Sequence, residues 1–574
     1  MSGCNEERVN REVRRKRRAV GVAMGREPAD LVLKHASYVN VFTGEILTAD
    51  IAAAEGLIAG VGSYSGREER DCTGKLVLPG FLDAHIHLES SLVAPAEFVR
   101  AVLPHGTTTV VTDPHEIANV MGADGIAYML QATEGLPVDV RFMLPSCVPA
   151  TPLDESGAAL GREDLDGFYS HPRVQGLAEM MNFVGVLAGD ESVLEKLAAA
   201  DLAGRRIDGH APDLADGGLN AYIAAGVRSD HECHDLKDAI AKLERGQYIM
   251  IREGTAARNL EALVPLLNEK YGSRCLLCTD DKHPGDLLKT GHIDAIIRRA
   301  VALGADPMAA VRAATLNAAQ YFGLHDRGAV APGYLADLVI VDDFQSFQVE
   351  AVYRKGVLAA EHGAAKPFPV PAVEPRLTER ARHTFRVGTL TAEDFCSDSP
   401  LGVVGMVDGE ITTVDRGRAG KPDAARDILR AAVVERHKGT GHIGLGFLQG
   451  YGLKSGAVAT SISHDSHNII VVGAGEAECA AAANRVAELN GGIVVWNDGK
   501  PVAEVPLDMG GIMSGEPLEM VNEQLESAKA AAYALGVNRG IDPFMTLSFM
   551  ALPVIPTLRL TTRGVFDVGK QDYV

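Results

Sequence analysis

Residues 76–92, with the sequence LVLPGFLDAHIHLESSL, decide the fold. An apolar run passes through Pro-Gly, restarts and ends at His85-Ile86-His87. Successive side chains of a strand point to opposite faces, so His85 and His87 point the same way. Two neighbouring imidazoles at a strand end can bind one metal ion or flank a site for two. A lone His-x-His also fits two surface histidines in a loop, so the ends of the later strands must decide between these interpretations.

Seven further strand-like runs follow and alternate with helix-like segments. They cover residues 107–112, 138–144, 173–178, 206–209, 226–229, 247–251 and 274–278. Eight β-then-α units predict a parallel (β/α)₈ barrel of the TIM type, whose active site lies at the carboxyl ends of its strands. Seven of the eight runs end in His, Asp or Glu, and the other ends in Pro-Ser-Cys. Loops are often polar, so one such ending means little, but a whole series with matching ligand types indicates a metal site.

Six of these strand-end side chains form a set of four imidazoles and two carboxylates. They are His85, His87, Glu179, His210, His231 and Asp280. Two divalent ions about 3.5–4 Å apart need such a set, and imidazole with carboxylate suits Zn, Fe or Mn. We expect His85 and His87 on one ion with Asp280, His210 and His231 on the other, and Glu179 between the ions. A water between them is the predicted nucleophile, with Asp280 as its base and as the acid for a leaving group.

The rest of the chain predicts a tail and two further domains. Short alternating runs with turn signals occur before and after the barrel, and we expect them to form one small β-sandwich into which the barrel is inserted. The segments are a basic tail at 1–27, the β-sandwich at 28–75 with 324–365, the barrel at 76–323, and an α+β domain at 380–574. No apolar stretch of signal-peptide length follows the basic run from Arg8 to Arg18, and we expect the tail to be disordered.

Composition excludes several classes of function. The chain has 574 residues and a net charge of -21, which argues against a nucleic-acid binder. It has no run of about 18 uncharged apolar residues, so we expect no membrane span. Eight scattered cysteines without a disulfide spacing suit a reducing cytoplasm. The acidic charge and the large C-terminal domain allow a homodimer.

The chain resembles the amidohydrolase superfamily and, within it, the bacterial adenine deaminases. The resemblance covers residues 28–574 and rests on the opening LVLPGFLDAHIHLESS, the ligand series, the closing GAVAPGYLADLVIVDD, and the segments TDPHEIANV, GLAEMMN, DGHAP, SDHE, REGTAARNL, TDDKHP, SHDSHN and GGIMSGEP. It implies a metal-dependent hydrolase that converts adenine and water into hypoxanthine and ammonia, in purine salvage or adenine catabolism, with two Mn²⁺ or Fe²⁺ ions. Zn²⁺ is not excluded by the ligand set.

The resemblance also implies a binding mode for the base. Adenine is expected with C6 over the bridging hydroxide, an acid at N1, and Asp280 protonating the departing amine. Candidates for base recognition are Glu89, Asp113, His115, Arg252, Glu253, His283, His464 and His467. Each has a structural alternative, such as a helix cap, a strand end, a solvated loop or an ion pair between Arg252 and Glu253.

Two other functions stay open. The first is a related hydrolase that acts on a cyclic amide or a different nucleobase, with the same metal ligands. Dihydroorotases and hydantoinases bridge their metals with a carboxylated Lys, whereas the corresponding strand here ends in Glu179 with no Lys nearby, which weakens the cyclic-amide assignment. The second is a non-catalytic member of the fold, which the complete ligand set argues against.

Overall fold

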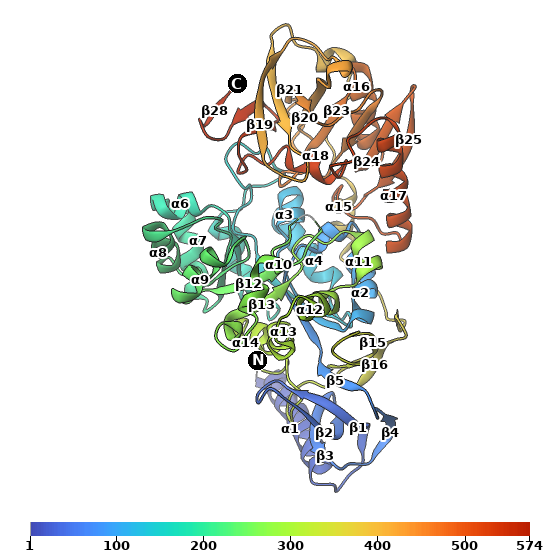
Figure 1. Ribbon diagram of the computed structural model, residues 1–574. Helices are drawn as coiled ribbons and strands as arrows, with labels where there is room; N and C mark the ends of the chain where they lie inside the picture. Colours follow the sequence, from blue (N-terminus) through green and yellow to red (C-terminus); the bar gives the residue numbers. More distant parts are fainter. Residues whose placement is uncertain (1, 256) are drawn as a thin grey trace.

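A computed structural model describes residues 2–255 and 257–574 of the chain. Three bodies are stacked along its length (Figure 1). The sheet domain with the N-terminal strands lies at the bottom, the barrel in the middle, and the C-terminal sheet domain at the top. Within the described residues, no helix combines the length and the apolar character that crossing a membrane requires.

The middle body is the parallel eight-stranded barrel that the sequence predicts. One ladder contains β6 (Phe81–Ile86), β7 (Thr107–Thr112), β8 (Asp139–Leu144), β9 (Val174–Met180) and β10 (Arg206–Gly209). A second ladder contains β11 (Ser229–Asp230), β12 (Tyr248–Arg252) and β13 (Cys275–Cys278). The amide of Asp280 donates a 2.9 Å hydrogen bond to the carbonyl of His85 and so joins the end of the last strand to the first. All the strand ends therefore meet at one mouth.

Helices cover the outside of the barrel. They are α2 (Pro95–Val102), α3 (His115–Met121), α4 (Ala123–Ala132), α5 (Arg162–Asp166), α6 (Phe183–Ala188), α7 (Glu191–Leu202), α8 (Asp216–Ala224), α9 (Leu236–Glu244), α10 (Leu260–Leu263), α11 (Pro284–Thr290), α12 (Ile293–Ala302), α13 (Pro307–Ala313) and α14 (Leu316–Tyr321). The strands alternate between two cores. In β13, Leu276 and Cys278 belong to the core inside the barrel, and Cys275 and Leu277 to the core beneath the helices, as the two-residue period of a strand requires.

The bottom body is one nine-stranded sheet built from both flanks of the barrel. Its strands are β1 (Ala29–Asn40), β2 (Glu45–Ala54), β3 (Leu57–Gly62), β4 (Gly66–Asp71), β5 (Leu76–Pro79), β14 (Leu338–Val341), β15 (Val349–Arg354), β16 (Val357–Glu361) and β17 (Ala364–Ala365). Leu33, Ile51, Leu338 and Tyr353 from its two halves share one core. The early and late segments are therefore one folded unit interrupted by the barrel.

The boundary between this sheet and the barrel differs from the sequence prediction. The run expected to open the barrel at residue 76 is β5, which pairs with β1 and β14 of the small sheet. The first barrel strand begins only at Phe81. A Cβ on Gly80 would lie 2.2 Å from the Thr108 hydroxyl oxygen, so the chain passes between the two sheets where only glycine fits.

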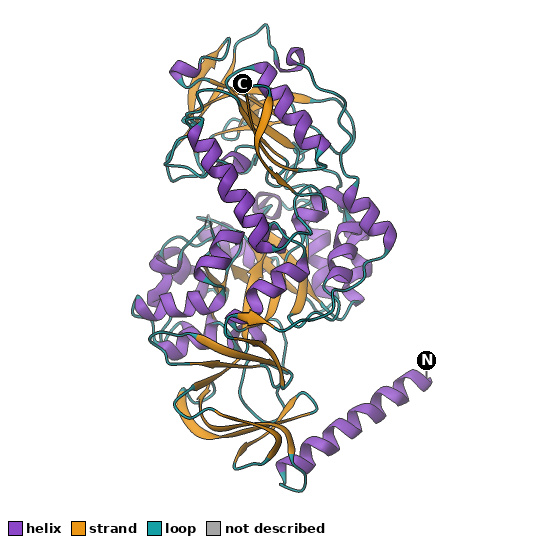
Figure 2. Ribbon diagram, turned by 90° about the vertical axis from the view of Figure 1, so that its right-hand side faces the viewer, coloured by secondary structure: helices purple, strands orange, loops and turns teal. Residues whose placement is uncertain are grey.

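The prediction of a disordered tail at 1–27 is wrong, because this segment contains helix α1 (Ser2–Ala23). Figure 2 shows the start of the helix standing away from the body of the protein. Its other end is anchored: Arg18 donates hydrogen bonds to Glu27 at 2.7 Å and to Asp30 at 2.9 Å, and Val22 is fully buried. Most residues of the basic run are good helix formers, so an anchored end is enough to support a helix despite charge repulsion.

The top body has the expected α+β architecture and follows α15 (Pro375–Arg382). Its main sheet contains β18 (Leu401–Met406), β19 (Thr413–Ala419), β20 (Leu429–Val434), β21 (Ile443–Gln449), β22 (Ala457–Thr460), β23 (Ile469–Gly473), β24 (Gly492–Asn497) and β25 (Lys500–Pro506). A small sheet contains β26 (Leu558–Thr561), β27 (Gly564–Asp567) and β28 (Asp572–Tyr573), and the main helices are α16 (Glu476–Glu488), α17 (Leu518–Ala534) and α18 (Met545–Phe549). The loop between β22 and β23 reaches the mouth of the barrel, which makes this body relevant to the site.

Candidate metal and substrate site

Glu179, at the end of β9, lies at the centre of the predicted ligand set. Its Oε1 atom is 3.3 Å from His87 Nε2 and 3.9 Å from His85 Nε2. Its Oε2 atom is 2.7 Å from His210 Nδ1 and 3.2 Å from His231 Nε2. The two oxygens of one carboxylate therefore face two separate pairs of imidazoles.

Asp280, just beyond β13, completes the set on the side of the first two histidines. Its Oδ1 atom lies 3.3 Å from His87 Nε2 and 3.6 Å from His85 Nε2. Its backbone has φ of 60°, in the left-handed region that Asp tolerates better than most residues. The structure thus brings all six predicted ligands together, and their role as ligands stays a prediction.

The donor set fits divalent cations. His85 Nε2 is buried, and no described residue offers it a hydrogen-bond partner. Burial opposes charge here, yet hydrogen bonds with Asp280 and Glu179 raise the pKa of His87 well above its usual range. Burial likewise opposes charge on His231, but the nearby Glu179 raises its pKa strongly. Protons on imidazoles balance the buried carboxylates, and bound cations would replace those protons.

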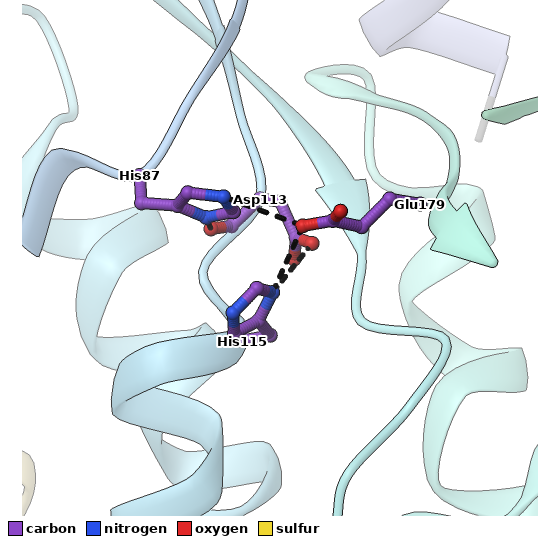
Figure 3. Close-up of side chains that lie close together, drawn as sticks. All are labelled: His87, Asp113, His115 and Glu179. Atoms are coloured by element: carbon purple, nitrogen blue, oxygen red, sulfur yellow. Dashed lines mark hydrogen bonds and ion pairs between the residues drawn. The ribbon is translucent and has the colours of Figure 1, made fainter. Parts of the chain in front are cut away.

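The loop after β7 orients His87, one of the predicted ligands (Figure 3). His87 Nδ1 lies 3.0 Å from the backbone carbonyl of Asp113, a contact that places the Nδ1 proton there and leaves Nε2 free to bind a metal. The Asp113 carboxylate is 2.8 Å from His115 Nδ1, which is also 3.6 Å from Glu179 Oε1. Asp113 and His115, both candidates from the sequence, therefore border the cluster.

A buried lysine organises the loops that carry His210 and His231. Lys242 Nζ donates hydrogen bonds to the carbonyl of Ala211 at 2.8 Å and to Asp230 Oδ2 at 3.0 Å. The other oxygen of Asp230 accepts the amide of Ala211 at 2.8 Å. Lys242 and Asp230 are both fully buried. Sequence reasoning missed Lys242, because a lysine on a helix usually faces solvent, as Lys237 of the same helix does.

Arg252 enters the site, whereas its neighbour Glu253 does not. Arg252 donates to Asp280 Oδ2 at 2.7 Å and to Glu232 Oε2 at 2.8 Å. Glu253 instead pairs with Arg299 on α12, so the alternative ion pair between Arg252 and Glu253 is absent from the described contacts. Glu232 was missed by sequence reasoning, although it directly follows a predicted ligand in the segment SDHE.

A cavity beside the cluster is lined by both the barrel and the top body. Its lining residues are Glu89, Ser90, Leu92, Glu116, His283, Ile462, His464, His467 and Ile512. Four of the eight candidates for base recognition are among them. Three of these residues are apolar (Leu92, Ile462 and Ile512) and the other six are polar, so the lining offers hydrogen bonds as well as apolar contact.

Two polar groups of this cavity have free hydrogen-bonding capacity among the described residues. Glu89 accepts the amide of Ile117 at 3.2 Å through Oε1, while its buried Oε2 has no partner. Burial raises the pKa of Glu89 to about 7. His283 Nδ1 is also buried without a partner, and burial lowers the pKa of this imidazole. Both groups are available to a ligand.

Glu116 is a further residue of the site that sequence reasoning missed. Its Oε1 lies 2.9 Å from His464 Nδ1, and its Oε2 accepts a hydrogen bond from His467 Nε2. Glu116 directly follows His115 in the segment TDPHE, but its partners are about 350 residues away in the chain, and nothing in the sequence pattern links them.

Family models match the chain in two parts. A model described as the amidohydrolase family matches residues 76–359, and a model described as the adenine deaminase C-terminal domain matches residues 408–572. The first match spans the barrel and the second lies within the top body.

Similar proteins cover nearly the whole chain. An adenine deaminase of Desulfatibacillum aliphaticivorans is 46% identical over 562 residues, which are 97% of this chain and 98% of the relative. An adenine deaminase of Brucella melitensis biotype 1 is 47% identical over 561 residues, which are 96% of this chain and 95% of the relative.

Solved structures resemble the chain more distantly. A β-aspartyl dipeptidase from Fervidobacterium islandicum AW-1 matches with a TM-score of 0.45 and 16% identity, covering 59% of this chain and 99% of that structure. An enamidase described as a member of the amidohydrolase superfamily matches with a TM-score of 0.44 and 18% identity, covering 59% of this chain and 97% of that structure.

Proposed function

The chain belongs to the adenine deaminase family of amidohydrolases, and we propose that the cluster at its barrel mouth binds the two divalent ions of this chemistry. The protein hydrolyses adenine to hypoxanthine and ammonia. The observation that supports the two-ion proposal is the position of Glu179, whose oxygens face two separate pairs of imidazoles. A carboxylate in this position is suited to bridge two cations.

We assign His85 and His87, with Asp280, to one ion and His210 and His231 to the other. Ions bound there would lower the pKa of water and supply hydroxide near neutral pH. We propose Mn²⁺ or Fe²⁺ as the native metal; Zn²⁺ accepts the same ligands. Glu232 lies 3.4 Å from His231 Nε2 and 3.5 Å from His210 Nδ1, where it adds negative charge beside the second ion.

Asp280 is the group that moves protons. It is ionised, because neighbouring imidazoles and Arg252 outweigh burial and hold its pKa well below the usual range. Its Oδ1 faces the cluster and can take a proton from the attacking water. As oxygen bonds to C6 and the C6–N6 bond breaks, Asp280 returns that proton to the nitrogen, which leaves as ammonia.

The cavity beside the cluster is the proposed site for the base. Leu92, Ile462 and Ile512 provide apolar surface for the faces of the ring. Glu89, with a pKa raised by burial to about 7, can donate a proton to a ring nitrogen and so make C6 more electrophilic. His283 offers a further polar contact. Glu253 does not contact the base in this arrangement, because its carboxylate pairs with Arg299.

The compartment and the assembly are further proposals. The cysteines whose side chains are described form no disulfide, which supports a reducing cytoplasm. We propose a homodimer, which the acidic charge and the large C-terminal domain allow, and no nucleic-acid partner, because the net charge of -21 disfavours one. Light scattering on the purified protein measures the mass in solution, and a monomer at working concentrations would contradict the dimer.

The test of the function uses purified protein loaded separately with Mn²⁺, Fe²⁺ or Zn²⁺. We expect loss of the adenine absorbance band, release of ammonia, and two metal ions per chain by elemental analysis. Full activity with one ion per chain would contradict the binuclear site. Turnover of another nucleobase or a cyclic amide, with none of adenine, would move the assignment to the alternative hydrolase.

A further inference from the structure

The C-terminal domain helps to line the proposed substrate cavity, and there it contacts one carboxylate of the barrel. Glu116 lines the cavity, and its two oxygens contact His464 and His467 from the loop between β22 and β23. On the other side, Glu116 Oε1 lies 3.6 Å from His115 Nε2, while His115 Nδ1 lies 3.6 Å from Glu179 Oε1. Glu116 is therefore about one imidazole ring away from the centre of the metal cluster.

The loop between β22 and β23, whose histidines contact Glu116, is itself tightly fixed. The amide of His467 donates a 2.7 Å hydrogen bond to the carbonyl of Ser463. The buried guanidinium of Arg436 donates to the carbonyl of His467 and, at 2.9 Å, to the carbonyl of Gly510. The ring of His464 stacks on Phe549, with centroids 4.7 Å apart and planes at 16°. Both histidines are therefore held in position by the C-terminal domain.

Glu116 retains capacity to accept another hydrogen bond. An ionised carboxylate has about four acceptor sites and no donor. Among the described residues, side-chain contacts within 3.0 Å of Glu116 come only from the two histidines of the loop. Because Glu116 also lines the cavity, a free acceptor position is available to a ligand.

We propose that Glu116 binds the substrate by accepting a hydrogen bond from the ring N–H of the free purine base, and that His464 and His467 position it for this contact. The proposal rests on the assigned adenine chemistry. Free adenine has one ring N–H, on its imidazole edge, away from C6. When C6 lies at the metal cluster, that edge extends toward the wall formed by Glu116. The C-terminal domain is then a working part of the active site, and a base substituted at N9 loses the contact.

The first test compares adenine with 9-methyladenine, which lacks the ring N–H. In Glu116→Gln we expect the KM for adenine to rise about 10- to 100-fold, the loss typical of a hydrogen bond to a charged group, with two metal ions per chain retained. We expect 9-methyladenine, tested as an inhibitor, to bind the wild type far more weakly than adenine does. The ratio of the affinities for adenine and 9-methyladenine should be smaller in Glu116→Gln than in the wild type. A purely structural role would lower activity without changing the ratio. An unchanged KM and an unchanged ratio in folded Glu116→Gln would overturn the proposal.

The second test separates positioning from general domain contact. His467→Gln should raise the KM for adenine, and the double variant with Glu116→Gln should be no worse than Glu116→Gln alone, because both changes remove one interaction. His442→Gln is the matched control: His442 pairs with Glu155 at 2.9 Å where the same two bodies meet, but it does not line the cavity. Equal effects of His442→Gln and His467→Gln would contradict the proposal. If His467→Gln does not fold, the ratio of the affinities for adenine and 9-methyladenine in Glu116→Gln decides whether the proposal holds. Failure of the wild type to deaminate adenine would instead contradict the assigned function.

Discussion

The guanidinium of Arg252 donates a 2.7 Å hydrogen bond to Oδ2 of Asp280. This contact occupies one oxygen of the carboxylate and leaves Oδ1 facing His85 and His87. Arg252 also pairs with Glu232, so one cation balances the buried carboxylate of Asp280 and the half-buried carboxylate of Glu232 at the mouth of the barrel. Arg252 thus fixes which oxygen of Asp280 faces the two histidines.

Replacing Arg252 with Lys tests this orientation. Lysine keeps the charge but loses the planar fork that contacts both carboxylates, so the change is not conservative. We expect kcat to fall about 10- to 100-fold, as a lost charge-assisted hydrogen bond predicts, with the KM for adenine changing much less. Steady-state kinetics on metal-loaded protein measure both constants. A kcat equal to that of the wild type would show that the orientation of Asp280 does not depend on the guanidinium.

Asp280→Asn removes the proposed proton shuttle with almost no change in shape. We expect turnover of adenine to be lost, because an amide cannot take a proton from water and return it to the leaving nitrogen. Circular dichroism and thermal unfolding check that the fold is retained. Full activity in a folded variant would reject the role of Asp280.

Metal removal and pH are linked through the histidines of the cluster. Carboxylate neighbours raise the pKa values of His87 and His231 in the metal-free protein, so a cation bound by these imidazoles would displace protons from them. We expect metal affinity to fall as pH decreases and binding to release protons. Calorimetry of the chelator-treated protein in buffers of different ionisation enthalpy measures this release. Affinity that does not vary with pH would contradict the assignment of these histidines as ligands.

Lys242→Met tests the support beneath the second pair of histidines. The change leaves Asp230 fully buried without its cation, a loss that typically costs about 3–5 kcal/mol. We expect a lower unfolding temperature and weaker binding of one of the two ions, because Lys242 holds the loops carrying His210 and His231. Lys237→Met, on the same helix, is a suitable control for the substitution itself. Equal stability of the two variants would show that the buried ion pair is not required.

His437 predicts a pH-dependent stability in the C-terminal domain. Burial and the neighbouring Arg436 hold the pKa of His437 well below its usual range. A depressed folded-state pKa contributes stability that is present above the unfolded value of about 6.5 and is lost as pH falls below it. We therefore expect up to about 1.4 kcal/mol of lost stability per pH unit below about 6.5. His437→Gln should flatten this dependence in scanning calorimetry between pH 5 and 7.5, and an unchanged slope would exclude His437 as its source.

Much of the catalytic body could be predicted from local patterns. His85 and His87 share a strand face because side chains alternate along a strand, and parallel strands of a barrel end at one mouth. The convergence of Glu179, His210 and Asp280 follows from these two rules without knowledge of any contact. The resemblance of the motifs to one family then named the reaction. These features are local, or are repeated once in each β-then-α unit, so the spacing of residues along the chain is enough to predict them.

The contacts that link distant segments depended on how the bodies pack. Glu116 meets His464 and His467 only because the C-terminal domain is seated over the barrel, and no periodicity records that docking. Arg252 and Glu253 are adjacent in the chain, yet one faces the cluster and the other faces Arg299. The burial of Lys242 and the anchored helix at the N-terminus have the same origin. The direction of a side chain outside a regular strand is set by the partners that the folded chain brings to it, and those partners lie far away along the chain.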